Sequence, residues 1–461
     1  MSIFGLITRI HMIGVGGAGM CGIAEILKNL GFRVTGSDLV PGETTERLEK
    51  LGVPISYGHG PGNVGDAEVV VKSSAIPDDN PELVAARKLG LPVIRRAEML
   101  AELMRMKKGI AVCGTHGKTT LTSILAELMA AGGLDPTYVI GGRLNSAGAN
   151  AKLGDGEYLV AEADESDGSF LRLSPIYVIL TNIDEDHLDY YGDFDAVKRA
   201  FAEFVDKVPF YGLALVCRDD PGATDIITEI QRPYYTYGAE PGADVSIGDI
   251  KYEGLKTSFD LTIKGIDQGR FIVNLPGKYS ALGAGAAAAM AILLGVGADS
   301  IRETLDRFAG VEMRFQEIGR AGDIIVIHDY AHHPKELETA LAALRIAYPD
   351  RRFLTVFQPH RYTRTRDQLE NFGPSLMNTD AIVITSIYAA GESKIEGVDA
   401  EAIAEDMKYR GHKAVEYIAD KGEVATRVAA TAEPGDVLVH LGAGDVWKIA
   451  AEVVARLEGK R

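Results

Sequence analysis

The chain has 461 residues, 46% of them hydrophobic and 25% charged, which is typical of a soluble globular protein with about three domains. Its formal net charge of −17 argues against nucleic acid as a partner, because a phosphate backbone requires a basic surface. The three cysteines are widely spaced and predict no disulfide framework or zinc cluster. No secretory signal and no apolar run of about 20 residues is visible, so we expect a cytoplasmic protein without a membrane partner.

The first predicted domain, residues 1–106, has the alternating strands and helices of a parallel α/β unit. Its strands are expected at Ile10–Val15, Arg33–Ser37, Val69–Lys72 and Val93–Ile94. A glycine turn, Gly14-x-Gly16-x-x-Gly19, follows the first strand, and Asp38 ends the second. This is the dinucleotide fingerprint, in which the turn admits a pyrophosphate and the acid binds a ribose. Taken alone, it predicts a Rossmann-like domain of an NAD-dependent oxidoreductase.

Two further α/β domains are predicted over residues 107–312 and 313–461. The central strands are expected at Ile110–Cys113, Tyr158–Glu162, Tyr177–Thr181 and Leu213–Cys217. Close-set alternating strands over Tyr234–Val273 then predict a small antiparallel sheet, and an Ala-rich helix follows from Tyr279. The third domain is expected to be Rossmann-like, with strands at Ile324–His328, Arg352–Phe357, Ala381–Thr385 and Val437–Leu441.

A second phosphate-binding loop lies at the start of the central domain. It comprises Gly114, Thr115, His116, Gly117, Lys118, Thr119 and Thr120, between a predicted buried strand and an amphipathic helix. N–H groups at such a helix start point at a phosphate, Lys118 reaches its β and γ oxygens, and the Thr119 hydroxyl can bind Mg²⁺. The strict P-loop pattern fails, because Val112 stands at its first glycine. A βα turn with a surface lysine is the alternative, but the flanking elements favour a P-loop-type ATP-binding domain.

Acidic residues follow the next two predicted strands. Glu162 ends the first of them, where a carboxylate can face a Mg²⁺ beside the phosphate loop. For Asp164, Glu165 and Asp167 we favour a solvated charge cluster. His187 lies in an acidic loop after the second strand, and spacing alone favours an incidental histidine over a metal ligand.

Two loops rich in histidine and arginine follow strands of the third domain. One carries His328, Asp329, Tyr330, His332 and His333, and the other carries His360, Arg361, Arg364 and Arg366. Open α/β sheets bind ligands at the carboxyl ends of strands, where arginine suits a carboxylate or a phosphate. A solvated helix start capped by Thr363 is the alternative for the second loop.

Nine segments in this order resemble the Mur ligases of bacterial cell-wall synthesis over nearly the whole chain. They read "HMIGVGGAGMCGIAEIL", "VTGSD", "VKSSAI", "GTHGKTT", "IGGRLNSAG", "AEADESDGSFL", "TNIDEDHLD", "DYAHHPKE" and "FQPHRYTRTRD". The match is most similar to the branch that joins L-alanine to UDP-N-acetylmuramate. In that family the first glycine turn binds the UDP of the sugar and ATP binds at the second loop. The resemblance therefore implies why one chain carries two phosphate-binding loops.

The resemblance implies an ATP- and Mg²⁺-dependent amide ligase. The lactyl carboxylate of UDP-N-acetylmuramate attacks the γ-phosphate of ATP, and the amine of L-alanine then displaces phosphate from the acyl phosphate. Lys118 and Mg²⁺ offset the repulsion between the two anions as they meet. The sequence leaves both a monomer and a homodimer open.

The resemblance also assigns residues to sites. The catalytic residues it implies are Lys118, Glu162, His187, Arg314 and Asp329, and the metal ligands are Thr119, Glu162 and His187. The residues that would hold the incoming amino acid are Tyr330, His332, Arg361 and Arg364. The residues of the UDP-sugar site would be Gly16, Gly17, Ala18, Gly19, Asp38, Ser73, Ser74, His116 and Asn145.

The sequence departs from the family where adenine and ribose bind. The usual His-Asn pair and further Asn are replaced by Tyr279, Ser280 and Gly283, so that either Tyr279 stacks on adenine or nucleotide affinity is weak. The expected double arginine is Met313-Arg314. Lys198 lies near the carbamylated lysine of some relatives, but we favour a solvated helix face for it.

Three alternatives remain. A sister ligase would add another amino acid or a recycled peptide to the same UDP-sugar. An NAD-dependent oxidoreductase would leave the second loop, Glu162 and the third domain without a role. A nucleotide-binding protein that has lost catalysis would explain the altered adenine segment, but not the presence of Lys118, His187 and Asp329.

Overall fold

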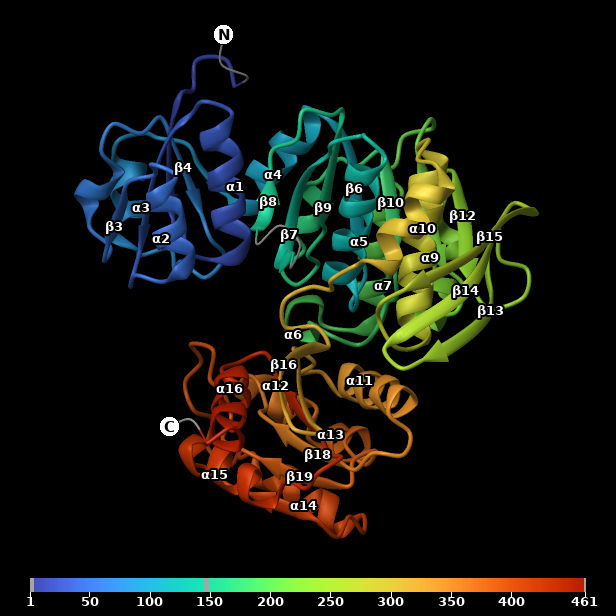
Figure 1. The fold of residues 1–461 in the computed structure, drawn as a ribbon. Coiled ribbons are helices and arrows are strands. Elements are labelled where there is room, and N and C mark those ends of the chain that lie inside the picture. The colour runs from blue at the N-terminus through green and yellow to red at the C-terminus, as the bar shows by residue number, and fades with distance from the viewer. Residues whose placement is uncertain (1–3, 145–148, 460–461) are drawn as a thin grey trace. The chain divides into compact units, whose positions relative to one another are not determined.

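The computed structural model of the chain describes residues 4–144 and 149–459, and its strands form three sheets (Figure 1). The chain divides into two compact units, which are described separately. Unit 1 comprises Met1–Asp249, Phe259–Phe271 and Leu282–Phe308, and unit 2 comprises Ile250–Ser258, Ile272–Ala281 and Ala309–Arg461. None of the helices in the described ranges has both the length and the apolar character needed to cross a membrane.

The first sheet is parallel and has the strand order β3-β2-β1-β4-β5. Its strands are β1 (Arg9–Ile13), β2 (Arg33–Asp38), β3 (Ile55–Tyr57), β4 (Val69–Lys72) and β5 (Val93–Arg95). The helices between and after them are α1 (Ala18–Asn29), α2 (Glu43–Lys50), α3 (Pro81–Lys88) and α4 (Arg96–Arg105). This confirms the predicted α/β unit. The short strand β3 was not predicted, because its residues are only partly buried or exposed and show no apolar run.

A buried carboxylate, Glu82, connects the elements of this sheet. Its oxygens lie 2.7–2.9 Å from four side-chain donors, which are His11 Nε2, Ser37 Oγ, His59 Nδ1 and Asn63 Nδ2. Burial by itself raises the pKa of Glu82, but these hydrogen bonds outweigh it and bring the pKa to about 2. An ionised carboxylate is tolerated in this core because two donors face each of its oxygens.

The central sheet has the order β15-β14-β13-β12-β11-β10-β6-β9-β7-β8. Its strands are β6 (Lys108–Cys113), β7 (Thr137–Leu144), β8 (Ala149–Lys152), β9 (Tyr158–Glu162), β10 (Tyr177–Leu180), β11 (Leu213–Cys217), β12 (Tyr234–Gly238), β13 (Val245–Glu253), β14 (Lys256–Ile263) and β15 (Ile266–Val273). The principal helices are α5 (Lys118–Ala131), α6 (Leu188–Tyr191), α7 (Phe194–Val205), α9 (Lys278–Leu293) and α10 (Ala298–Asp306).

The predicted antiparallel sheet is an extension of this central sheet. β12 pairs in parallel with β11, and β13 continues in parallel from β12. Within Tyr234–Val273, only the neighbours β13, β14 and β15 are joined by two-residue turns, which require antiparallel hairpins. The prediction of antiparallel pairing was therefore wrong at Tyr234–Gly238, because a short alternating segment does not reveal its pairing partner.

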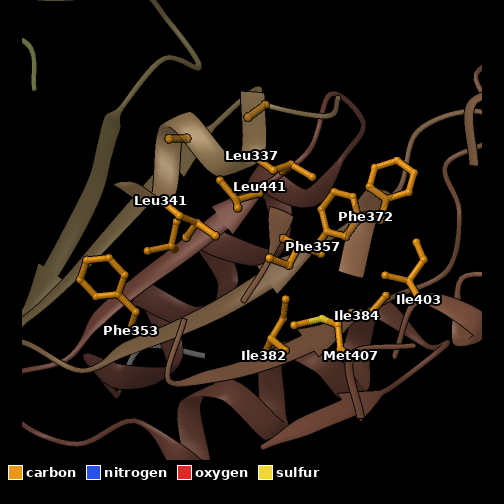
Figure 2. Close-up of a cluster of buried hydrophobic side chains, with 14 of the residues drawn as sticks. Leu337, Leu341, Phe353, Phe357, Phe372, Ile382, Ile384, Ile403, Met407 and Leu441 are labelled. Carbon is orange, nitrogen blue, oxygen red and sulfur yellow. The ribbon is translucent and has the colours of Figure 1, made fainter. Parts of the chain in front are cut away.

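The third sheet, in unit 2, has the order β16-β17-β21-β18-β19-β20 and only β16 is antiparallel. Its strands are β16 (Gln316–Ala321), β17 (Ile324–Asp329), β18 (Phe353–Phe357), β19 (Ala381–Ile384), β20 (Val415–Tyr417) and β21 (Val437–Leu441). One face packs against α11 (Pro334–Ala347), α13 (Leu369–Ser375) and α14 (Glu401–Tyr409) through the apolar cluster of Figure 2. The other packs against α15 (Lys421–Thr431) and α16 (Val446–Leu457).

The second face of this sheet also contains two fully buried histidines on adjacent strands. His328 of β17 and His440 of β21 are direct neighbours in register, and His328 Nδ1 lies 3.1 Å from the His440 carbonyl oxygen. Burial lowers the pKa of both rings, that of His440 to about 3. Both imidazoles are therefore neutral in the folded protein at pH 7.

We expect Glu82→Gln to destabilise the first sheet by about 3 kcal/mol, because the amide NH₂ replaces an oxygen that faces two donors. Hydrogen-exchange mass spectrometry of peptides from β1 and β2 measures this loss as faster exchange. Glu49→Gln, at an exposed position of α2, is the matched control. Equal exchange in both variants would contradict the role of Glu82.

Acid should destabilise unit 2 before it affects the Glu82 network. A buried histidine whose pKa is lowered in the folded state contributes its full amount to the free energy of unfolding when the pH is above its unfolded-state pKa of about 6.5. This contribution is lost as the pH falls toward the folded-state pKa. The contribution of Glu82 is present above about pH 4.5 and is lost only as the pH falls toward 2.

Trp447, the one tryptophan of the sequence, lies in α16 and reports urea unfolding of unit 2 by fluorescence. The urea concentration at the unfolding midpoint should decrease as the pH is lowered from 6.5 to 4. This decrease should be smaller in His440→Leu, because the variant takes up one proton fewer when it unfolds in acid. The same pH dependence in both proteins would refute the assignment.

Candidate active site

The phosphate loop joins the end of β6 to the start of α5. Gly114 and Gly117 have φ values of +129° and +81°, which side chains rarely adopt. A Cβ at Gly114 would lie 2.1 Å from the Thr181 hydroxyl oxygen, so this position requires glycine. Lys118 is the first residue of α5. The segment is thus the strand-turn-helix that the sequence predicts for a phosphate site.

The residues that follow β10 hold this loop in place. His116 N–H donates to Asn182 Oδ1 over 2.8 Å, and the Asn182 amide donates back to the His116 carbonyl oxygen over 3.1 Å. The Thr181 hydroxyl donates to the same carbonyl over 2.7 Å. Thr181 and Asn182 were not predicted as site residues, because only the pairing of β10 with β6 brings them to the loop.

Lys118 is bound in a pocket of acceptors. Its Nζ lies 2.6 Å from the Gly114 carbonyl oxygen and 2.9 and 2.8 Å from the two carboxylate oxygens of Glu165. Burial lowers the pKa of Lys118, but the surrounding carboxylates, Glu165 first, outweigh burial and raise it. The lysine is therefore charged. The prediction of a solvated cluster was wrong for Glu165, whose side chain is only 2% exposed.

Glu162 ends β9 beside the first turn of α5. Its Oε1 accepts the Gly141 N–H over 2.8 Å, and Thr119 donates to its side chain. Burial raises the pKa of Glu162, and the Gly141 hydrogen bond and Lys118 oppose this shift. A carboxylate and a hydroxyl in contact are oxygen ligands of the kind that Mg²⁺ prefers. The structure thus brings together two of the three predicted metal ligands.

The third predicted metal ligand, His187, lies near the carboxylates of Glu165 and Asp186. It has a left-handed backbone with φ +57° at the start of α6, a conformation uncommon outside glycine. Its Nε2 lies 3.8 Å from Glu165 Oε1 and 3.7 Å from Asp186 Oδ2. Lys198, by contrast, pairs on α7 with Asp195 and Asp225, as expected for a solvated helix face.

The first glycine turn is closed by the acid that the fingerprint would offer to a ribose. Asp38 Oδ2 accepts the Gly16 N–H over 2.8 Å, and its Oδ1 accepts the Leu39 N–H over 2.8 Å. Both oxygens thus bind the chain's own backbone. These two hydrogen bonds fix Asp38 at the base of the glycine turn.

Other predicted UDP-site residues lie around the same turn. The Ser73 Cβ lies 3.2 Å from where a Cβ of Gly14 would be, and Ser74 beside it is exposed. Arg96, which the sequence analysis did not single out, packs on Gly19, where a Cβ would lie 2.8 Å from its Nη1. Gly17 and Ala18 begin α1, and His116 lies in the second loop. Asn145 is outside the described residues.

In unit 2, Asp329 ends β17 and is almost fully buried. Its Oδ2 accepts the Phe315 N–H over 2.9 Å, its Oδ1 accepts the Ala331 N–H over 2.8 Å, and Arg314 Nη1 lies 4.0 Å from Oδ1. Met313 and Phe315, which flank Arg314, have φ values of +63° and +45°. Such strain persists only where the surroundings impose it, and it is common at functional sites.

A row of rings lies beyond the strand ends of this sheet. The ring centroids of Tyr330 and His332 are 5.3 Å apart, those of His332 and His360 5.5 Å, and those of His360 and Tyr388 5.6 Å. Burial lowers the pKa of His332 to about 4, with Glu336 opposing the shift and Arg364 adding to it. Burial first, then His332, Arg364 and Arg361, lower the pKa of His360 to about 3. Tyr388 was not predicted, because only the bridge between His360 and Tyr388 brings its loop to this row.

The two predicted amino-acid-binding arginines flank this row. Arg361 has φ +69° and donates its N–H to the Tyr388 carbonyl oxygen over 2.8 Å, while its side chain is exposed. Arg364 Nη1 lies 3.5 Å from His360 Nδ1. Thr363 does not cap a helix, since its hydroxyl donates to Glu392 Oε1 over 2.6 Å. Arg366 pairs with Asp367.

At the altered adenine segment, α9 begins at Lys278 and the Tyr279 side chain is 56% exposed. The Ser280 hydroxyl donates to the Pro276 carbonyl oxygen over 2.7 Å. Gly283 lies within the helix. Of the three replacements, only Tyr279 presents a large exposed side chain.

Three family models match successive parts of the chain. They are the Mur ligase family catalytic domain over residues 9–108, the Mur ligase middle domain over 112–291, and the Mur ligase glutamate ligase domain over 313–444. This agrees with the three-domain α/β architecture predicted from the sequence.

Curated relatives and solved structures agree with the family models. The chain is 50% identical to the UDP-N-acetylmuramate–L-alanine ligase of Geotalea uraniireducens and 48% identical to that of Geobacter sulfurreducens, each over 99% of both chains. The crystal structure of UDP-N-acetylmuramate–alanine ligase from Thermotoga maritima matches with a TM-score of 0.83 and 29% identity, over 98% of this chain and 99% of that one. The chain therefore belongs to the Mur ligase family.

Proposed function

We propose that this protein joins L-alanine to the lactyl carboxylate of UDP-N-acetylmuramate, with hydrolysis of ATP to ADP and phosphate, in peptidoglycan synthesis. The observation that carries the proposal is the charged Lys118 at the start of α5, with Glu162 and Thr119 beside it. The full-length similarity to ligases with this name supports the choice of substrates. We place the reaction in the cytoplasm, in a monomer or homodimer.

The chemistry follows from the charges of the substrates and of the site. A carboxylate is a poor acyl donor, and transfer of a phosphoryl group to its oxygen makes that oxygen a good leaving group. The attacking carboxylate and the γ-phosphate are both anions, so the ammonium of Lys118 and the N–H groups of the loop must offset their repulsion. The amine of L-alanine then attacks the acyl carbon, and phosphate leaves.

Thr119 and Glu162 would hold a Mg²⁺, and His187 would complete the ligand set from α6. The donor set fits, since the hydroxyl and the carboxylate already contact each other beside the phosphate loop. When bound, the ion would neutralise phosphate charge during transfer.

We assign the incoming amino acid to Tyr330, His332, Arg361 and Arg364, with Arg314 and Asp329 at the reaction centre. The lowered pKa of His332 and His360 keeps both rings neutral, so the arginines are the cations available to a carboxylate. Domain boundaries near residues 106 and 312 fit this division, because they fall between α4 and β6 and between α10 and β16.

We assign the UDP-sugar to the glycine turn of residues 14–19, to Asp38, Ser73 and Ser74, and to His116 and Asn145 for its lactyl arm. Arg96 joins them as an additional cation, because its guanidinium already packs on Gly19. In this assignment Asp38 shapes the turn through its two backbone hydrogen bonds.

Phosphate release from ATP should require Mg²⁺, UDP-N-acetylmuramate and L-alanine together, because the acyl phosphate forms only on the sugar and is consumed only by the amine. A coupled phosphate assay with each component omitted in turn measures this. Release with another amino acid or a peptide, and none with L-alanine, would assign the chain to a sister activity. Binding of ATP without release under any condition would indicate a protein that has lost catalysis.

Arg361→Lys should raise the KM for L-alanine about 10- to 100-fold with a smaller change in kcat, because a lysine cannot form the paired hydrogen bonds of a guanidinium. Steady-state kinetics with varied L-alanine measures the split. Arg366→Lys, in the helix α12 (Tyr362–Asp367) that follows Arg361, is the matched control, because Arg366 pairs with Asp367. An unchanged KM in Arg361→Lys would remove this residue from the amino-acid site.

A further inference from the structure

All three N–H groups of the Lys118 ammonium have acceptors within the chain. An ammonium carries three protons, and four acceptors lie within hydrogen-bond distance of Nζ. These are the carbonyl oxygens of Gly114 and Thr115, at 2.6 and 3.1 Å, and both carboxylate oxygens of Glu165. A phosphate that binds Lys118 must therefore displace an acceptor. The carbonyls belong to the loop itself, so Glu165 is the group that can give way.

Glu165 also connects the lysine to the element that carries His187. Its Oε1 lies 2.9 Å from Lys118 Nζ and 3.8 Å from His187 Nε2. Its carbonyl oxygen accepts the Tyr191 hydroxyl over 2.6 Å, which ties the loop after β9 to α6. The same carboxylate thus faces the phosphate-binding cation on one side and the proposed metal ligand on the other.

Stability alone does not explain this buried carboxylate. Desolvation of two charges costs about as much as their attraction returns, so a buried ion pair contributes little net stability. At a phosphate loop the pair has a different effect, because the carboxylate occupies the position of an anion. It keeps Lys118 charged and oriented while no phosphate is present.

We propose that Glu165 is a positioning residue that exchanges partners when nucleotide binds. In the nucleotide-free protein it holds Lys118, and when the phosphates of ATP take the lysine, its released carboxylate orients the His187 ring. The exchange rests on the proposed ATP site. It couples the binding of phosphate by Lys118 to the orientation of the His187 ring, so that the two occur together.

The exchange makes two opposite predictions for Glu165→Gln. Without its resident anion, Lys118 should bind ATP in the absence of metal about tenfold more tightly, by isothermal titration calorimetry with EDTA. The Mg²⁺ concentration that gives half of the maximal ATP affinity should rise about tenfold, because His187 is no longer oriented. A merely structural defect would weaken both kinds of binding.

Two variants separate the exchange from a general charge effect. Asp164→Asn removes the same charge next to Glu165, but Asp164 bonds Arg96 and Ser166, so it should tighten metal-free ATP binding twofold at most. Glu185→Gln, in the exposed part of the loop before His187, should leave both measurements unchanged. If Glu165→Gln does not fold, Glu165→Asp replaces it, with a carboxylate withdrawn by one methylene and an expected tightening of about threefold.

Metal-free affinity that is unchanged or weaker in the folded Glu165 variant would overturn the exchange, whatever the activity. An effect of equal size in Asp164→Asn would overturn it too. Failure of the proposed function is recognised separately, since it would leave the wild-type chain without phosphate release in the presence of UDP-N-acetylmuramate and L-alanine.

Discussion

The site of unit 1 depends on one physical constraint. The Lys118 ammonium must remain charged although it is largely buried at the start of α5. Burial and the positive end of α5 both oppose a charged Lys118. The carboxylates of Glu165, Asp164 and Glu162 outweigh this cost, and the Gly114 carbonyl accepts one N–H of the ammonium. The elements around the loop each contribute to this arrangement. The segment after β9 brings Glu165 to the lysine, the end of β10 brings Thr181 and Asn182 to the loop, and α6 brings Tyr191 to the Glu165 carbonyl.

The candidate site of unit 2 has a different distribution of charge. Its strand ends present imidazoles that burial keeps neutral, and Asp329 is held by two backbone N–H groups. The arginines at 314, 361 and 364 are then the charged groups that can attract an anion at this edge. Three left-handed residues, Met313, Phe315 and Arg361, fix the backbone around them. The arrangement suits recognition of a carboxylate rather than proton transfer by histidine.

The first sheet contains the strand, glycine turn and helix of a common nucleotide-binding fingerprint. The strand, glycine turn and helix form as the pattern predicts, yet Asp38 binds the Gly16 and Leu39 N–H groups. An acid engaged in this way shapes the turn. The local fold of the fingerprint is thus confirmed, whereas the oxidoreductase that it suggests when taken alone is ruled out by the family to which the chain belongs.

The sequence by itself determined the three α/β domains, the two glycine turns and the residues at the ends of β6, β9, β17 and β18, because these are encoded by local apolar periods and turn residues. It did not determine the pairing of β12, the short strands β3 and β20, or the partners of Glu165, Asn182 and Tyr388. Strand pairing and burial arise from contacts between distant segments, and no local pattern distinguishes a solvated glutamate from one that a folded sheet places against a lysine.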